Sequence, residues 1–165
     1  FGDLTVLENV MVGCHCRSKS GLLGAIFRTP ATRREERAIR EKSLELLAYV
    51  GLTEFANIQA RNLSYGHQRR LEIARALATE PKLLALDEPA AGMNATEKLE
   101  LRELLLRIRD DGKTILIIEH DVGLVMGICD HLTVLDYGKV IASGKPADVR
   151  VHPEVIKAYL GQGAA

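Results

Sequence analysis

The chain has 165 residues, and its 22 Lys and Arg are balanced by 22 Asp and Glu, so the formal net charge is zero. Apolar residues make up 47% and charged residues 27%, an ordinary globular composition that excludes disordered, collagenous and low-complexity classes. A zero net charge argues against a protein that coats nucleic acid, because no excess of cations displaces counterions. No apolar run approaches the roughly 18 residues of a membrane span. We expect a soluble, single-domain chain with no nucleic-acid partner.

The three cysteines are Cys14, Cys16 and Cys129. An odd count without a signal peptide is a poor disulfide framework and favours reduced thiols in the cytosol. The sequence Cys14-His15-Cys16 invites a metal interpretation, but no second Cys/His pair lies at the spacing that a zinc site requires. We therefore expect no metal at these cysteines.

The amino-terminal part of the chain is predicted to be helical. Thr5 and Glu8 form a capping box that begins a short helix, which Gly13 can end. Residues 17–31 contain Ser, Gly and Pro around two short apolar pairs, which indicates a loop with a short helical turn.

A second capping box, Thr32 to Glu35, predicts the start of a longer helix that runs to Val50 and is capped by Gly51. Its first half is rich in Arg and Glu, and these charges nearly cancel. We interpret them as a solvated face with i,i+4 ion pairs rather than as a nucleic-acid patch.

From residue 66 onward, short apolar strands alternate with helices. This order predicts an α/β layer with a mostly parallel sheet. The expected elements are a helix at 66–79, a buried strand at 83–86, a helix from 95 to 112 capped by Asn94, a buried strand at 114–118, a short helix ending near Cys129, a hairpin over 132–142, and helical segments at 146–150 and 153–160.

Two acidic residues, Asp87 and Glu88, follow directly after the first strand. Open α/β sheets bind their ligands at the carboxyl ends of strands, and two adjacent acids there are costly unless a cation or a reacting group uses them. In nucleotide hydrolysis the first acid can serve Mg²⁺ and the second can deprotonate the attacking water. The alternative is a pair of solvated carboxylates at a strand end.

His120 and Ser64 are the other candidate residues. His120 follows the second strand, where a histidine can contact a γ-phosphate, although Asp121 as a helix N-cap explains the same segment without a ligand. Ser64 begins a helix, and Gly66 lets the backbone approach a ligand closely, so this helix start is a possible anion site. An ordinary serine N-cap is the alternative.

Taken together, these segments resemble the ATP-binding subunits of ABC transporters. The matching segments are Leu63–Gln68 for the signature motif, Leu83–Asp87 for the Walker B strand, Glu88 for the catalytic glutamate, Ala90–Asn94 for the D-loop and His120 for the switch histidine. A closer likeness is to the ATPases of branched-chain amino-acid (Liv-type) uptake systems. It rests on 4–10, 69–75, 88–94 and 155–161.

The sequence departs from the family pattern in three ways. Tyr65 and His67 replace a Gly and the final Gln of the signature, and Asn94 replaces the usual D-loop Asp. The phosphate-binding sequence G-x-x-x-x-G-K-[ST] is absent, since Gly112-Lys113-Thr114 lacks the first Gly and precedes a strand. The chain thus looks like the carboxy-terminal two-thirds of such a subunit.

The resemblance implies a partial P-loop NTPase core with the ABC helical subdomain. We expect the helical subdomain and signature helix at 1–80, the Walker B and H-loop half of the core at 81–144, and a helical tail at 145–165. It also implies ATP and Mg²⁺ as cofactors. The implied site residues are Glu88 and His120 for catalysis, Asp87 for Mg²⁺, and Ser64, Tyr65, Gly66, His67 and Asn94 for nucleotide binding.

The implied partners are a second ATP-binding subunit, identical or different, and membrane permease subunits at the cytoplasmic face of the inner membrane. Two alternatives remain. The chain as given can be a folded fragment or docking module without catalysis, because it has no P-loop. It can also belong to an ABC ATPase of DNA repair or translation, although it lacks heptad arms and basic extensions.

Overall fold

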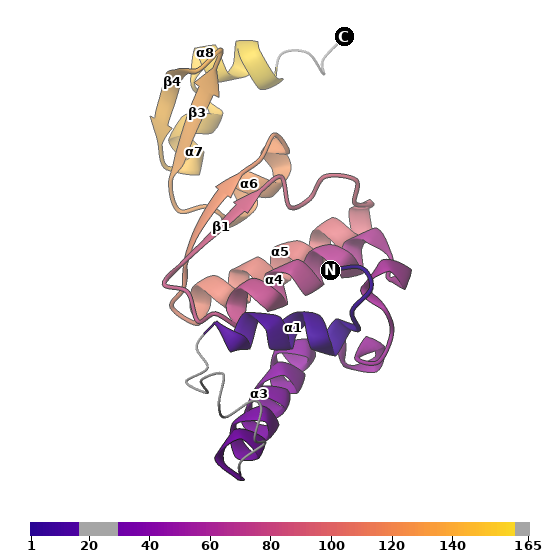
Figure 1. Ribbon diagram of the computed structural model, residues 1–165. Helices are drawn as coiled ribbons and strands as arrows, with labels where there is room; N and C mark the ends of the chain where they lie inside the picture. The colour runs from indigo at the N-terminus through magenta and orange to yellow at the C-terminus, as the bar shows by residue number, and fades with distance from the viewer. Residues whose placement is uncertain (17–29, 161–165) are drawn as a thin grey trace. The chain divides into compact units, whose positions relative to one another are not determined.

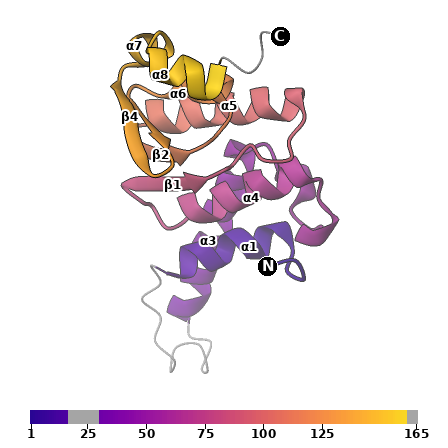
Figure 2. The same ribbon diagram turned by 90° about the horizontal axis from the view of Figure 1, so that it is seen from above.

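The computed structural model describes residues 1–16 and 30–160, and these fall into two compact units. The first contains Phe1–Ala85 together with Gly112–Leu116, and the second contains Leu86–Asp111 and the chain from Ile117 onward. Figures 1 and 2 show the elements of both in colours that follow the chain. In the described residues, no helix is both long enough and apolar enough to cross a bilayer.

The first unit is a cluster of helices in which α1 packs against α3 and α4 (Figure 1). Its elements are α1 (Val6–His15), α3 (Pro30–Tyr49), α4 (Tyr65–Leu77) and two single-turn 3₁₀ helices, η1 (Thr53–Phe55) and η2 (Ala60–Asn62). The capping box at the start of α1 is confirmed. Thr5 Oγ1 accepts from the N–H of Glu8 at 3.2 Å, and Glu8 Oε2 accepts from the N–H of Thr5 at 2.8 Å.

Helix α1 runs two residues past Gly13, so the prediction that this glycine ends the helix is wrong. A Cβ placed on Gly13 would lie only 2.3 Å from the carbonyl oxygen of Arg75 and 2.8 Å from Cβ of Ala78, both in or next to α4. Gly13 is therefore a contact point at which two helix backbones approach each other closely, rather than a helix end.

The beginning of α3 also differs from the prediction, whereas its end agrees. The helix starts at Pro30, so Thr32 lies inside its first turn and is not the N-cap. Proline suits the first helical position because the N–H that it lacks would have no partner there. Gly51 ends the helix with a φ of 74°, and the N–H of Leu52 donates to the oxygen of Leu47 at 2.7 Å. Of the loop expected over 17–31, the part up to residue 29 lies outside the described residues.

Strands β1 (Leu83–Asp87) and β2 (Thr114–Ile118) form a two-stranded sheet. The N–H of Thr114 donates to Lys82 O at 3.2 Å, and the N–H of Glu88 donates to Ile118 O at 2.8 Å, so pairing advances in the same direction on both strands. The predicted parallel pair is present. The expectation that both strands are buried is wrong, because Leu84 is the one buried residue of β1 and no residue of β2 is buried.

The second unit combines helices with an antiparallel hairpin. Its elements are α5 (Ala95–Asp110), α6 (Val122–Ile128), β3 (Leu132–Asp136), β4 (Lys139–Gly144), α7 (Pro146–Arg150), α8 (Pro153–Val155) and the π-helical turn η3 (Ile156–Leu160). One face of α5 is buried; its members are Leu101, Leu104, Leu105 and Ile108.

The hairpin prediction is confirmed as well. Asp136 pairs with Lys139, which leaves two turn residues, Tyr137 and Gly138, with φ values of 43° and 76°. Positive φ at both central positions is the type I′ turn that matches the twist of a hairpin. The register shifts at a bulge between Val134 and Leu135.

Candidate functional site

Glu88 adopts a backbone conformation that is rare for a residue with a side chain. Its φ is 44°, in the left-handed region, directly after the last residue of β1. Such a conformation costs of order 1–3 kcal/mol and persists where the surrounding structure fixes it, which is common at functional sites. Here the hydrogen bond from Glu88 N to Ile118 O holds the backbone to the end of β2.

His120 lies beside Glu88 in the second unit, so the structure brings these two predicted catalytic residues together. The imidazole Nδ1 is 3.4 Å from Glu88 Oε1, and both side chains are more than half exposed. The pair forms an ion pair when the imidazole is protonated. Because both groups are accessible, a carboxylate and an imidazole can act on the same bound molecule at the carboxyl ends of β1 and β2.

Asp87 precedes this pair in sequence, and its side chain is exposed and makes no hydrogen bond to the described residues. Nowhere in 1–16 or 30–160 do three or more His, Cys, Asp or Glu side chains gather as a metal site. Mg²⁺ usually takes only one or two protein carboxylates and completes its shell with waters and phosphate oxygens, so the donor set at Asp87 suits that ion.

Cys14 is buried, with its Sγ 3.6 Å from Ser43 Oγ.

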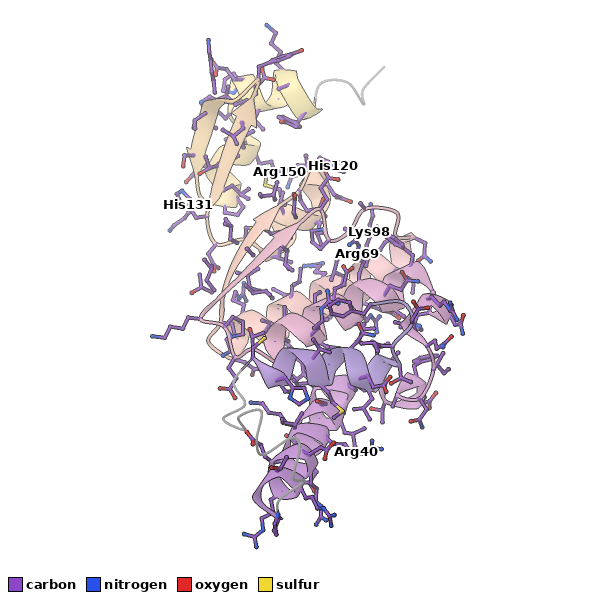
Figure 3. All side chains as sticks on the ribbon, in the orientation of Figure 1. Arg40, Arg69, Lys98, His120, His131 and Arg150 are labelled. Carbon is purple, nitrogen blue, oxygen red and sulfur yellow. The ribbon has the colours of Figure 1, made fainter. Side chains whose placement is uncertain are left out.

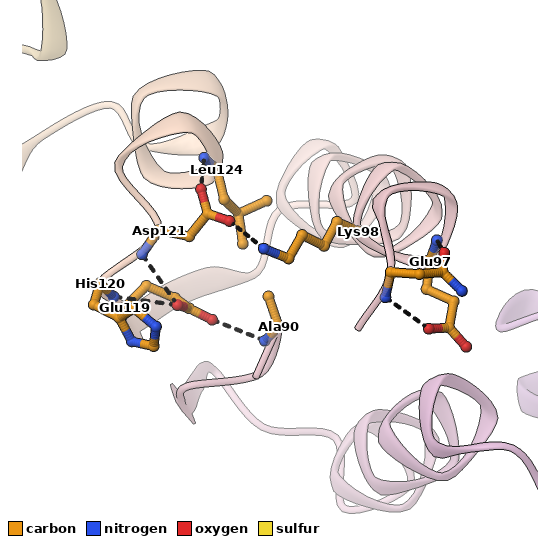
Figure 4. A network of polar contacts seen from close by, with 8 residues as sticks. Ala90, Glu97, Lys98, Glu119, His120, Asp121 and Leu124 are labelled. Carbon is orange, nitrogen blue, oxygen red and sulfur yellow. Dashed lines mark hydrogen bonds and ion pairs between the residues drawn. The ribbon is translucent and has the colours of Figure 1, made fainter. Parts of the chain in front are cut away.

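Glu119 is a residue of this site that the sequence analysis missed. Figure 4 shows its carboxylate between two backbone segments. Its Oε1 accepts from the N–H of Ala90 at 2.8 Å, and its Oε2 accepts from the N–H groups of His120 at 3.2 Å and Asp121 at 3.5 Å. No strand pattern in the sequence singles it out, because Glu119 lies just beyond the last residue of β2, Ile118.

Asp121 is the N-cap of α6, as the interpretation of this segment without a ligand predicts. Its Oδ1 accepts from the N–H of Leu124 at 3.0 Å, and its Oδ2 accepts from Lys98 Nζ at 2.6 Å. The hydrogen bond from Lys98, helped by the one from Leu124, lowers the pKa of Asp121 below its ordinary value. The same contact raises the pKa of Lys98.

Asn94 caps α5 through a capping box, as predicted. Its Oδ1 accepts from the N–H of Glu97 at 2.9 Å, and Glu97 Oε2 accepts from the N–H of Asn94 at 3.0 Å. The side-chain oxygen of Asn94 is thus already used, and its exposed Nδ2 is the group that is left to contact a ligand.

Ser64, Tyr65, Gly66 and His67 lie in the first unit, at the start of α4. Ser64 is the N-cap, and its Oγ accepts from the N–H of His67 at 3.3 Å. In the described chain the N–H groups of Tyr65 and Gly66 have no acceptor, so they and the macrodipole of this 13-residue helix favour an anion.

Two ring contacts fix the side chains around this helix start. The His67 ring stacks at a tilt on Phe55 in η1, with the ring centroids 4.7 Å apart. The guanidinium of Arg69, labelled in Figure 3, lies over the ring of Tyr65, 4.9 Å from its centroid, and donates to the Tyr65 hydroxyl. Tyr65 is therefore held by Arg69 while remaining 43% exposed.

Comparison with known proteins decides the family. A model described as ABC transporter matches residues 1–91, more than half of the chain. The chain belongs to the ABC transporter family. A second family model, described as a branched-chain amino acid ATP-binding cassette transporter, matches residues 139–165 of this ABC transporter chain.

The curated relatives of this ABC transporter chain include ATP-binding proteins of branched-chain amino acid transport. It is 48% identical over 163 residues to the high-affinity branched-chain amino acid transport ATP-binding protein LivG of Salmonella typhimurium. It is 47% identical to LivG of Escherichia coli K12 and to the corresponding protein BraF of Pseudomonas aeruginosa. Each match covers 98% of this chain but 64% of the relative, so the chain spans about two-thirds of their length.

Solved structures agree with the fold expected for this family. The ADP conformation of MJ1267, an ATP-binding cassette of an ABC transporter, matches with a TM-score of 0.77 and 34% identity, covering 97% of this chain and 64% of that one. A nucleotide-free ATP-binding cassette from an ABC transporter matches with a TM-score of 0.72 and 32% identity, over 97% and 60%. The predicted α/β class with an ABC ATPase core is confirmed.

Proposed function

We propose that this chain is part of an ATP-hydrolysing subunit that powers transport of branched-chain amino acids across a membrane. The observation that carries the proposal is the Glu88–His120 pair at the ends of two parallel strands. A carboxylate and an imidazole there suit the deprotonation of a water molecule that attacks a phosphoryl group. The branched-chain substrate class rests on the identity to LivG and BraF.

Each residue takes one role in this proposal. Glu88 accepts the proton of the attacking water, and His120 contacts the terminal phosphate and holds the Glu88 carboxylate in place. Asp87 holds Mg²⁺, which neutralises developing charge on the phosphates when it is bound. Asn94 contributes its amide to the same region.

The start of α4 serves a second subunit in this proposal. The hydroxyl of Ser64 and the N–H groups of Tyr65 and Gly66 bind the terminal phosphate of an ATP held by the other subunit, beside His67. Two subunits, identical or different, thus enclose the nucleotide between them. The helical part of the first unit docks on permease subunits at the cytoplasmic face of the inner membrane.

A substitution that adds a large, positively charged side chain at Ser64 tests this arrangement in the full-length subunit that contains the chain. Ser64→Arg should fill the anion site, so ATP-dependent dimerisation and ATP-driven uptake of leucine should both be lost while each subunit still binds ATP. Thr53→Arg adds the same side chain at an exposed position of the same unit and should leave dimerisation unchanged. Dimerisation of Ser64→Arg with ATP, measured by light scattering, would contradict the proposed role.

A further inference from the structure

Both oxygens of the Glu119 carboxylate are engaged by backbone N–H groups from two different segments. One oxygen faces Ala90, in the loop that follows Glu88, and the other faces His120 and Asp121 (Figure 4). Ala90 itself is only 3% exposed, so its N–H has little access to water as a substitute partner. The carboxylate thus bridges two segments that lie 29 residues apart in sequence.

The bridge is one link in a closed set of contacts. From Asp121 the set continues through the 2.6 Å ion pair to Lys98 on α5. The capping box of Asn94 and Glu97 then fixes the start of that helix, which directly follows the loop containing Ala90. Because the set returns to its starting segment, movement of the loop relative to His120 requires at least one of these contacts to break.

The acceptor groups and the length of glutamate suit this bridge. An ionised carboxylate accepts at both oxygens, whereas the amide of glutamine has one acceptor oxygen and would turn an NH₂ group toward a backbone N–H. Aspartate has the same acceptors on a side chain shorter by one methylene.

From these contacts we infer that Glu119 is a positioning residue that holds the loop after Glu88 at a fixed distance from His120, and so holds the two side chains in reach of each other. This inference rests on the proposed hydrolytic function. Glu119 contacts backbone N–H groups and no reacting atom, so its removal should slow the chemical step rather than weaken nucleotide binding.

Full-length subunits with Glu119→Ala and Glu119→Gln test the inference. For Glu119→Ala we expect kcat for ATP hydrolysis to fall by about 10- to 100-fold, since small misplacements of reacting groups cost up to about a hundredfold, with KM changed less than about twofold. Glu119→Gln, which is isosteric, should retain one of the two links and give an intermediate kcat. Amide hydrogen exchange at Ala90 should accelerate in Glu119→Ala.

Glu103→Ala is the matched control, because it removes an exposed carboxylate of α5 that takes no part in this set of contacts. We expect its kcat to stay within about twofold of the wild type. A normal kcat in both Glu119 variants, an equal loss in Glu103→Ala, or unchanged exchange at Ala90 would overturn the inference. If the wild-type subunit hydrolyses no ATP, both the proposed function and the positioning role of Glu119 are wrong. Amide exchange at Ala90 needs no ATP hydrolysis, so it still tests whether Glu119 bridges the two segments.

Discussion

Asp121 uses its two carboxylate oxygens for two different stabilising contacts, the N–H of Leu124 and the ammonium of Lys98. Because its pKa is lowered in the folded chain, folding is stabilised by the ionised form above the unfolded pKa of about 3.9. That contribution is lost as the pH falls through the lower folded value. For Lys98, whose pKa is raised, the contribution is present at neutral pH and is lost only above about pH 10.4.

Asp121→Asn should keep the N-cap and remove the charge, so its destabilisation should be largest near pH 7 and shrink below about pH 4. Asp121→Ala also removes the cap and should cost a further 0.5–2 kcal/mol or so of unfolding free energy. Denaturant unfolding from pH 3 to 7 measures both. Asp3→Asn, at an exposed ion pair with Arg61, should be close to neutral. A pH-independent effect of Asp121→Asn would show that its charge does not stabilise the fold.

For single residues, the sequence predicted which side chains lie at the strand ends. It did not predict the hydrogen bonds that hold these side chains in place. Asp87, Glu88 and His120 follow from the rule that parallel strands present ligand-binding groups at their carboxyl ends. Glu119 could not be found in the same way, because its partner Ala90 is brought to it only by the turn at Glu88, whose positive φ has no signature in the sequence.

Helices α1 and α4 approach closely at Gly13, and a substitution at this residue tests how the helices of the first unit pack. In Gly13→Ala the new Cβ would meet the Arg75 carbonyl oxygen at 2.3 Å, and a backbone atom cannot swing away as a side chain can. The helices must separate, so unfolding free energy should fall by about 1–3 kcal/mol despite the better helix propensity of alanine. Thermal unfolding measures the change.

Gly123→Ala is the control for this substitution, because a Cβ there meets a side-chain atom, Asp121 Oδ1 at 3.3 Å, and no backbone atom that close. It should be neutral or stabilise α6 by up to about 1 kcal/mol. If Gly13→Ala were as well tolerated as Gly123→Ala, the close contact between α1 and α4 would be wrong.

Element boundaries show where local sequence rules succeed and where packing overrides them. The capping boxes at Thr5 and Asn94 form because each N-cap residue itself has an extended backbone and an apolar stripe follows it. The similar pattern at Thr32 is not a cap, because Pro30 already starts the helix two residues earlier. Gly13 was mistaken for a helix end because its actual partner, α4, lies more than fifty residues away along the chain.

On the scale of the whole chain, many apolar side chains of the strands are exposed to solvent. The exposed fractions reach 53% for Leu83, 53% for Leu116 and 60% for Ile118. Exposed apolar surface of this kind marks an interface with other protein. The chain on its own should therefore bind an apolar-surface dye.

The double variant Leu116→Thr, Ile118→Thr should lower dye fluorescence with little loss of stability, since threonine keeps the β propensity of these positions. Leu99→Thr removes one exposed leucine from α5 and should change the signal less. Dye binding that is absent, or that is unaffected by the double variant, would contradict an uncovered sheet.

The central claim is that the carboxylate of Glu88 serves ATP hydrolysis, and one measurement tests it most directly. ATP turnover and ATP affinity should be compared between the full-length subunit and its Glu88→Gln variant, which keeps the shape of the side chain but cannot accept the proton of the water. General-base catalysis contributes about a hundred- to ten-thousand-fold, so turnover should fall by that factor while ATP affinity is retained. Turnover close to that of the wild type would contradict the assignment of Glu88 as the base.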